Sequence, residues 1–155
     1  MYFLIVLGVF LLMEGIAWVS HKYVMHGFLW KWHEDHHKPG KSFFEKNDRF
    51  YLIFAVPSFV ALLYGCVYAN PVWISVGVGA SLYGMAYFFV HDVFIHQRFG
   101  WFKNSDNVYL KGIRRAHKIH HKHLYKEDGE CFGMLLVPFK YFSEARKQPK
   151  GSPVK

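Results

Sequence analysis

Three long apolar runs constrain the fold of this chain more than any other feature of its sequence. They cover residues 1–20, 51–69 and 72–90, and each is long enough to cross the apolar core of a bilayer as a helix. Only Asn70 and Pro71 separate the second run from the third, and this pair is a turn signal. The sequence therefore predicts an all-α integral membrane bundle with three spans, two of which form a helical hairpin.

The positive charges indicate how these spans are oriented. The chain has 19 Lys and Arg residues, and all of them lie either between Lys22 and Arg49 or from Arg98 onward. Because cytoplasmic loops are enriched in Lys and Arg, we expect the N-terminus outside and both charged segments in the cytoplasm. The net charge of +8 thus belongs to one membrane face, and we expect no nucleic-acid partner.

The histidines repeat one bipartite pattern. His21 and His26 have the spacing His-x4-His, which returns in His91 and His96, and each pair is followed by His-x2-His-His. The ten histidines of the two copies are His21, His26, His33, His36, His37, His91, His96, His117, His120 and His121. Only His123 falls outside the pattern. Because both copies follow a span that ends in the cytoplasm, they are predicted to meet in a cytoplasmic, helical, His-rich cap.

Helix geometry relates these spacings to metal binding. Residues i, i+3 and i+4 share a helix face, so His33, His36 and His37 are predicted to aim three imidazoles at one point, as are the three histidines that end at His121. The His-x4-His pairs lie roughly 140° apart on an ideal helix and can converge only near a helix end, across a bulge or through different atoms. Ten imidazoles suit two transition metals better than hard Mg or Ca ions.

Acidic residues near the histidines are candidates to orient them. Asp35 and Asp92 lie within the clusters, where each is either a hydrogen-bond acceptor for the far nitrogen of an imidazole or a solvated acid among basic neighbours. Glu14 lies in the first span, seven residues before His21 and on nearly the same helix face. An ionisable residue within a span is a functional candidate.

Aromatic residues gather near the predicted membrane interface. Trp18, Tyr23, Trp30 and Trp32 all follow the end of the first span closely. Amphipathic rings are favoured at this depth, so they form either a belt of lipid anchors or the lining of an entrance for an apolar substrate.

The remaining segments are shorter and less apolar. Pro39 and Gly40 are predicted to stop the helix that carries the first triad, and Asn107 or Asp106 to cap a helix that runs through His123. The run 132–139 is too short to span and is predicted to be interfacial or re-entrant, a possible fourth segment. Residues 144–155 are charged and contain Pro and Gly, which predicts a single domain over 1–143 and a disordered tail.

The repeated histidine series resembles that of the membrane-bound di-iron hydroxylases. Three local sequences, Glu14-Gly-Ile-Ala-Trp18, His21-Lys-Tyr-Val-Met-His-Gly27 and His96-Gln-Arg-Phe99, resemble bacterial β-carotene hydroxylases of the fatty acid hydroxylase/sterol desaturase superfamily. This resemblance implies an O2-dependent mono-oxygenase of the bacterial inner membrane that hydroxylates carbon 3 of β-ionone rings, converting β-carotene to zeaxanthin through β-cryptoxanthin. It also implies that the ten histidines bind two iron ions.

Other functions remain open at this point. A fatty-acid or sterol hydroxylase or desaturase of the same superfamily would share the histidine series. A His-rich metal transporter should place its ligands near the bilayer midplane rather than at the span ends, and a haem carrier would use only two axial histidines. The sequence has no Gly-rich dinucleotide fingerprint, and Cys66 and Cys131 make no iron–sulfur set. Electrons are therefore expected from an external donor such as ferredoxin.

Overall fold

The computed structural model describes residues 1–38, 42–102 and 105–149, and within these ranges it contains helices and loops but no strand. In chain order the elements are α1 (Tyr2–Val19), η1 (Ser20–Phe28), α2 (Trp30–His37), η2 (Lys46–Asp48), α3 (Arg49–Val67), α4 (Pro71–Phe88), η3 (Phe89–Ile95), α5 (Val108–His120) and α6 (Lys140–Arg146). The predicted all-α fold is confirmed.

Three helical stretches are long and apolar enough to cross a membrane. They cover Tyr2–Phe28, Lys46–Val67 and Pro71–Ile95. This confirms the three predicted spans and a membrane protein. Each stretch is longer than the apolar run that predicted it. α1 and α4 continue without a break into η1 and η3, which carry histidines, and η2 directly precedes α3.

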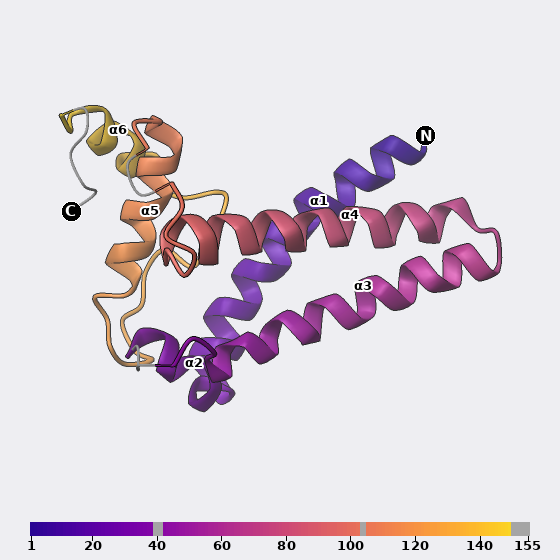
Figure 1. Cartoon of the computed structure of the whole chain (residues 1–155), viewed down its shortest axis with the longest axis horizontal. Coiled ribbons are helices and arrows are strands. Elements are labelled where there is room, and N and C mark those ends of the chain that lie inside the picture. The colour runs from indigo at the N-terminus through magenta and orange to yellow at the C-terminus, as the bar shows by residue number, and fades with distance from the viewer. Residues whose placement is uncertain (39–41, 103–104, 150–155) are drawn as a thin grey trace.

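The second and third spans form an extended hairpin arm, seen on the right of Figure 1. Asn70 caps α4, with its Oδ1 accepting hydrogen bonds from the amides of Val72 and Trp73 at 3.1 and 3.3 Å. A Cβ on Gly77 would lie 2.6 Å from the backbone nitrogen of Leu62, so a glycine is required where α3 and α4 approach each other. The predicted hairpin is confirmed.

α1 crosses α4 at a second close contact. A Cβ on Gly79 would lie 2.7 Å from the carbonyl oxygen of Val6. The crossing brings η1 and α2 to the same end of the bundle as η3 and α5, while the turn at Asn70 lies at the far end of the arm (Figure 1). Both copies of the histidine pattern therefore lie at one end of the spans.

α5 lies at the histidine end of the spans (Figure 1). Asn107 caps it by accepting a hydrogen bond from the amide of Leu110 at 3.1 Å, as predicted, but the helix ends at His120 and does not continue through His123. Its residue Ile113 is buried in an apolar cluster with Phe94 of η3 and with Met134.

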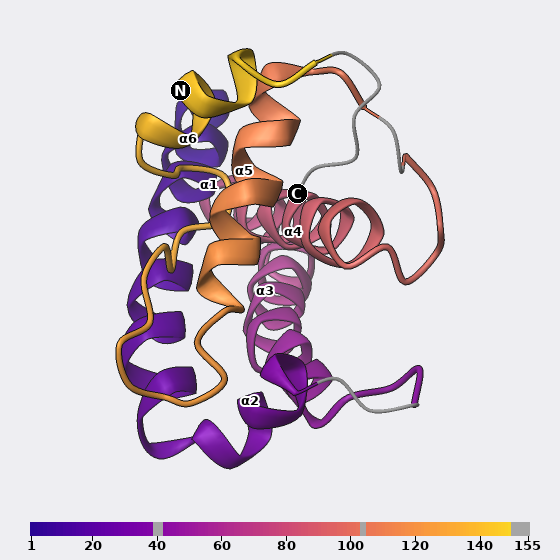
Figure 2. The ribbon, with the colours of Figure 1, turned by 90° about the vertical axis from the view of Figure 1, so that its left-hand side faces the viewer.

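The segment 132–139 is not a fourth spanning helix. Among the described residues it forms irregular chain that lies along α1 (Figure 2). The carboxylate oxygen Oε1 of Glu14 accepts hydrogen bonds from the amides of Met134, Leu135 and Leu136 at 2.9–3.0 Å. A polar side chain within the first span thus satisfies backbone donors that have no helix of their own.

The predicted disordered tail begins too early. Residues 144–146 belong to α6, where Ala145 is buried and Glu144 forms an ion pair with Arg115 of α5. Residues 150–155 lie outside the described residues, as do Pro39 and Gly40, the predicted stop signal after α2. The helix itself ends at His37, directly before that signal.

Candidate metal centre

The two His-x4-His pairs lie on π-helical turns. His21 and His26 belong to η1, and His91 begins a turn of η3 that ends at His96. A π-helix bonds residue i to residue i+5, so residues five apart come to the same side, and such turns occur mostly at functional sites. Of the three ways in which these pairs were expected to converge, the structure uses the bulge.

Nine of the ten patterned histidines come together in two neighbouring sets. In the first, five ring nitrogens lie within 4.8 Å of one another, and the set consists of His21, His26, His33, His37 and His120. In the second, four nitrogens do so, from His36, His91, His96 and His117. His121 lies between the sets, with its Nε2 2.8 Å from that of His117 and its ring stacked on His37 at 4.4 Å.

These sets divide both predicted triads. His33 and His37 face the first set, whereas His36 faces the second, and His120 and His117 are divided in the same way. The expectation that three imidazoles of one triad would aim at one point is therefore wrong. Residues i and i+3 on a helix diverge enough to reach different centres when a second centre lies beside the first.

Backbone carbonyls orient much of the first set. The Nδ1–H groups of His21, His26 and His37 donate to the carbonyls of Phe132, Lys126 and His123 at 3.0, 3.1 and 2.7 Å. His120 does the same with the carbonyl of Glu130 at 2.8 Å. A carbonyl can only accept, so these bonds fix the proton on Nδ1 and leave the Nε2 lone pair facing the centre. His123 thus contributes its backbone rather than its imidazole.

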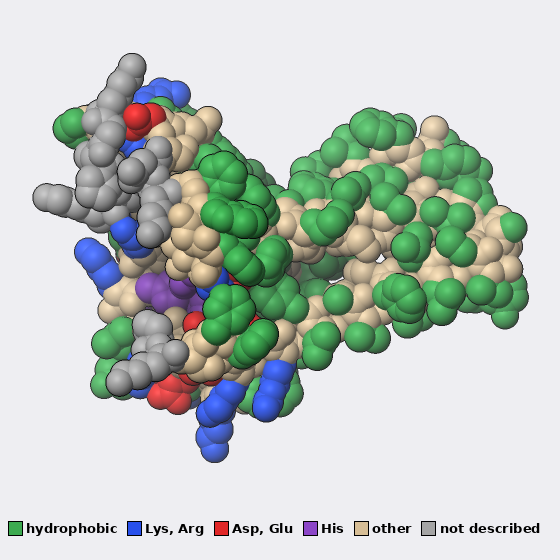
Figure 3. Space-filling model, viewed as in Figure 1, with side chains coloured by type: hydrophobic (Ala, Val, Ile, Leu, Met, Phe, Trp, Pro, Cys, Tyr) green, Lys and Arg blue, Asp and Glu red, His purple; other side chains and the backbone are tan. Residues whose placement is uncertain are grey.

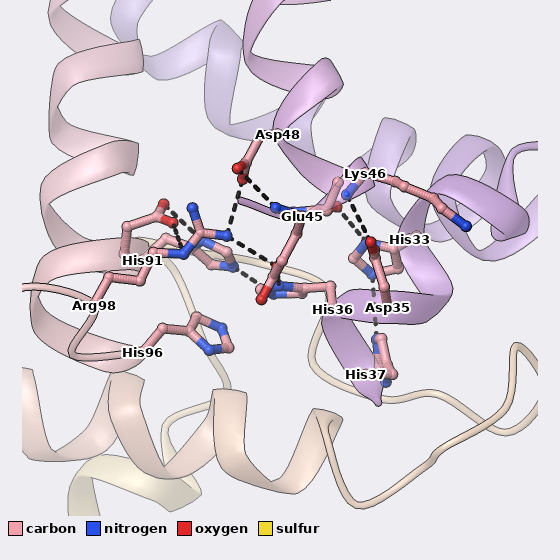
Figure 4. A network of polar contacts seen from close by, with 12 residues as sticks. His33, Asp35, His36, His37, Glu45, Lys46, Asp48, His91, His96 and Arg98 are labelled. Atoms are coloured by element: carbon pink, nitrogen blue, oxygen red, sulfur yellow. Dashed lines mark hydrogen bonds and ion pairs between the residues drawn. The ribbon is translucent and has the colours of Figure 1, made fainter. Parts of the chain in front are cut away.

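Side chains orient three of the other histidines (Figure 4). His33 donates to Oδ1 of Asn47 at 2.7 Å, and His36 donates to Oε2 of Glu45 at 2.7 Å. His91 donates to Oδ2 of Asp92 at 3.0 Å. Each bond uses Nδ1, so Nε2 again faces inward. The segment from Glu45 to Asn47 therefore supports one histidine of each set.

The electrostatics of the sets fit a bound cation. The Nε2 atom of His33 lies 3.1 Å from Nε2 of His21 and 3.2 Å from Nε2 of His37, so lone pairs face one another at short distance. Burial, followed by the nearby imidazoles, lowers the pKa of His37 to about 4 and of His120 to about 3, so protons do not neutralise this repulsion at pH 7. Neutral, inward-facing imidazoles are the donor set that a transition metal prefers.

Aromatic rings shield the first set from water. The ring of Phe132 packs against His21, His26 and His120 with centroids 5.2–5.4 Å apart. On another side, Trp30 packs against His26 and His37 at 5.1 and 5.3 Å.

The remaining sequence candidates lie further from the histidines. Among the hydrogen bonds of the described residues, Glu14 makes none to an imidazole; its Oε2 accepts from the Tyr83 hydroxyl at 2.6 Å. Asp35 accepts a hydrogen bond from the amide of Lys46 at 2.6 Å and so ties α2 to η2. The sequence put forward three acids, Glu14, Asp35 and Asp92. Of these three, only Asp92 accepts a hydrogen bond from a histidine among the described residues.

An apolar cavity of about 740 Å³ lies between the three spans. Its walls include Met13 of α1, Phe54 of α3 and Met85 of α4. Asn47 and Tyr51 also line it. Asn47 bonds His33 of the first set, and the Tyr51 hydroxyl donates to Asp92 beside His91 of the second. The cavity therefore reaches the partners of both histidine sets.

The four aromatic residues expected to frame a substrate do not line this cavity. Trp18 and Tyr23 are exposed and pack edge to face at 6.2 Å, and Trp32 lies beneath the guanidinium of Arg49. Trp30 contacts histidines instead of the cavity. These positions suit interfacial anchors better than a substrate wall.

Sequence reasoning missed the supporting residues Glu45, Asn47 and Tyr51. One signal was available in the sequence. Glu45, Asn47 and Asp48 stand just before an apolar run, on a membrane face otherwise rich in Lys and Arg. Nothing in the local pattern indicates the carbonyl acceptors, because they come from the irregular segment between α5 and α6.

Residues 6–142 match the family described as fatty acid hydroxylase. The chain is 41% identical over 135 residues to a beta-carotene hydroxylase of Pseudescherichia vulneris, covering 86% of this chain and 76% of the relative. It is 42% identical over 127 residues to one of Pantoea ananas, with coverages of 81% and 71%. A beta-carotene hydroxylase of Paracoccus sp. (strain N81106 / MBIC 01143) is 35% identical over 137 residues, with coverages of 88% and 84%. No solved structure matches the chain.

Proposed function

We propose, since this chain belongs to the fatty acid hydroxylase family, that it hydroxylates carbon 3 of the β-ionone rings of β-carotene, giving zeaxanthin through β-cryptoxanthin. The observation that carries the proposal is the apolar cavity that ends beside both histidine sets. The names of the three bacterial relatives support the choice of substrate.

The ten histidines would hold two iron ions, one in each set, with His121 between them. Iron held there would supply the oxidation of an unactivated ring C–H bond by O2, which no side chain can carry out. In the overall reaction one oxygen atom enters the new hydroxyl and the other leaves as water. Two electrons and two protons come from outside the chain.

The chain's own residues bind and orient the reactants. A terminal ring would occupy the cavity between α1, α3 and α4, where burial of apolar surface contributes about 25 cal/mol per Å². Asn47 and Tyr51 line the cavity on the histidine side and limit how far the ring can advance. Phe132 and Trp30 exclude water from the first set, which protects a reactive oxidant. A fixed ring position of this kind is what selects one carbon.

The electron donor would be a small acidic protein of the ferredoxin type. Lysines stand exposed around the histidine end, among them Lys38 directly after α2, Lys118 of α5, and Lys122 and Lys126 after α5. In Figure 3 basic side chains gather at the histidine end, whereas the surface of the hairpin arm is mostly apolar. Complementary charge steers a donor to this face.

The same charge distribution supports an orientation with the histidine end in the cytoplasm, in the inner membrane of a bacterium. The turn at Asn70 would then lie on the opposite side of the membrane. Reporter fusions at Met1 and at Asn70 test this orientation. Both should report the outer side, and a cytoplasmic Asn70 would contradict it.

Expression in a bacterium that accumulates β-carotene tests the function. We expect zeaxanthin, with β-cryptoxanthin as the intermediate, and no conversion by a His36→Ala variant present at equal amount in the membrane. Unchanged pigments together with hydroxylated fatty acids or sterols would contradict the carotenoid substrate and favour the other activities of the superfamily. Iron accumulation without any oxidised product would favour a transporter.

A further inference from the structure

We propose that Arg98 is a positioning residue that assembles the second histidine set by clamping the two carboxylates behind His36 and His91. The inference rests on the proposed function only in taking the second set as a metal site. It concerns a side chain that reaches no imidazole itself, and it follows from the network in Figure 4.

The guanidinium of Arg98 contacts three carboxylates. Its Nε lies 3.0 Å from Oδ1 of Asp92, and its Nη2 lies 2.9 Å from Oε2 of Glu45 and 2.9 Å from Oδ1 of Asp48. The Arg98 side chain is 13% exposed and that of Asp92 is 1% exposed. These contacts are therefore shielded from solvent screening more than a surface ion pair is.

Two of these carboxylates hold histidines of the same set. The Glu45 oxygen that contacts Arg98 also accepts the hydrogen bond from Nδ1 of His36. Asp92 contacts Arg98 through Oδ1 and accepts from His91 through Oδ2. The Nε2 atoms of His36 and His91 lie 3.0 Å apart at the centre. One guanidinium thus spans the outer side of two histidines that converge on the inner side.

The clamp also joins the two copies of the histidine pattern. His36 belongs to α2 in the first copy, and Glu45 lies in the connection to α3; His91 and Asp92 belong to η3 in the second copy. Arg98 follows η3, where its amide donates to the carbonyl of Asp92 at 3.0 Å and fixes the turn. Without this cation, Glu45, Asp48 and Asp92 would repel one another, and the two copies would lose the ion pairs that join them here.

The shape of arginine suits this position. The planar guanidinium holds Nε near one carboxylate and Nη2 near two others, whereas a lysine ammonium is one point charge. Lysine keeps the charge but cannot make all three contacts. The first histidine set depends less on this network, because Arg98 contacts none of its acceptors, which are four carbonyls and the amide of Asn47.

Titration of metal-free, detergent-purified full-length protein with Co²⁺ tests the role of Arg98. The wild type should bind two equivalents. Arg98→Gln should keep one tight equivalent and bind the second 10- to 100-fold more weakly, as expected for loss of an outer-shell partner. Arg98→Lys should recover part of that affinity. Arg115→Gln, which breaks an arginine–carboxylate ion pair between α5 and α6, should bind both equivalents as the wild type does.

Double variants identify which set is weakened. Adding His36→Ala to Arg98→Gln should change Co²⁺ binding little further, whereas adding His120→Ala should remove the remaining tight equivalent. If Arg98→Gln folds poorly, Asp92→Asn provides a second test. This variant keeps the arginine and should weaken binding of the second Co²⁺ equivalent in the same way. The d–d absorption of the retained Co²⁺ should match that of the wild-type first set.

Wild-type affinity for both equivalents in Arg98→Gln, or equal weakening of both, would overturn the proposal. A wild type that fails to bind two equivalents would overturn it together with the proposed metal centre. A wild type that binds two equivalents but leaves β-carotene unchanged in the host would refute the proposed substrate and leave the role of Arg98 standing.

Discussion

The Nε2 atoms of His26 and His120 lie 3.2 Å apart, although 94 positions separate the two residues in the chain. One comes from the first copy of the histidine pattern and the other from the second. The second set repeats this mixing, because His36 of the first copy lies beside His91 of the second. The two copies therefore form two interleaved centres instead of one centre each.

Because the two copies interleave, we expect a single histidine variant to weaken metal binding at one set and to leave the other set intact. His120→Ala should reduce binding at the first set and His36→Ala at the second, and each should lose hydroxylation, because the proposed reaction uses both metals. His123→Ala should keep both metals and most activity, since only its carbonyl contacts His37. Metal analysis of purified variants measures this directly. Full activity in either of the first two variants would count against the ligand assignment.

The cavity predicts a variant that loses turnover and keeps its metals. Gly84 lines the cavity, and a Cβ there meets nothing within 4 Å. Gly84→Leu should therefore fill the space for the ring and reduce conversion of β-carotene roughly tenfold or more. The protein should remain folded, since leucine is about 1 kcal/mol more favourable than glycine in a helix.

Gly8→Leu is the matched control for this variant. Gly8 lies on α1, is exposed, and also leaves its Cβ position open, but it does not line the cavity. Pigment analysis should show normal conversion by Gly8→Leu and low conversion by Gly84→Leu at equal iron content. Equal activity of the two variants would place the substrate elsewhere.

Glu14 should matter for stability more than for chemistry. Glu14→Ala leaves three backbone amides, that of buried Met134 among them, and the Tyr83 hydroxyl without their acceptor, at a cost of about 2–4 kcal/mol. Glu14→Gln should cost less because one oxygen remains. The control is Glu34→Ala, which removes an exposed ion pair with Lys38 and should change stability far less, because solvent screens such a pair. Thermal unfolding in detergent measures the difference, and equal midpoints for the two alanine variants would contradict it.

Acid should destabilise the metal-free protein. The folded state keeps His37 and His120 neutral down to pKa values of about 4 and about 3, whereas the unfolded chain takes up protons near 6.5. Because the unfolded state then binds more protons, stability is lost as the pH falls from about 6.5 toward 4. The thermal midpoint should fall over this range in metal-free protein. A midpoint that rises or stays constant would show that the imidazoles are not buried as neutral groups.

Much of the fold could be predicted because the bilayer restricts it. Apolar runs of sufficient length, with all Lys and Arg on one side, predicted the three spans and the shared end of both histidine copies. The conformation of the segments after each span was less accessible. An i, i+5 pair is compatible with several geometries, and only packing of η1 and η3 against the other helices selects the π-helical turn.

The sequence predicted which histidines would lie together, but not how they are divided between the two sets. Spacing identifies which imidazoles are candidates, but it cannot say that His33 and His36 face different centres, because that depends on where α5 is placed. The same holds for Glu45 and Asn47, whose roles follow from the path of a loop. Glu14 shows the converse: its position in a span marked it as important, but the sequence did not indicate its partners, which are the Tyr83 hydroxyl and three amides 120 or more positions away.

Labelling with 18O2 tests the central claim most directly. Membranes that contain the chain, given β-carotene, iron and a ferredoxin-type reductant, should form zeaxanthin whose new hydroxyl oxygens come from 18O2. Membranes with His36→Ala should form none. Zeaxanthin that carries oxygen from water, or that forms equally well with His36→Ala or without O2, would contradict oxygenation at the histidine centre.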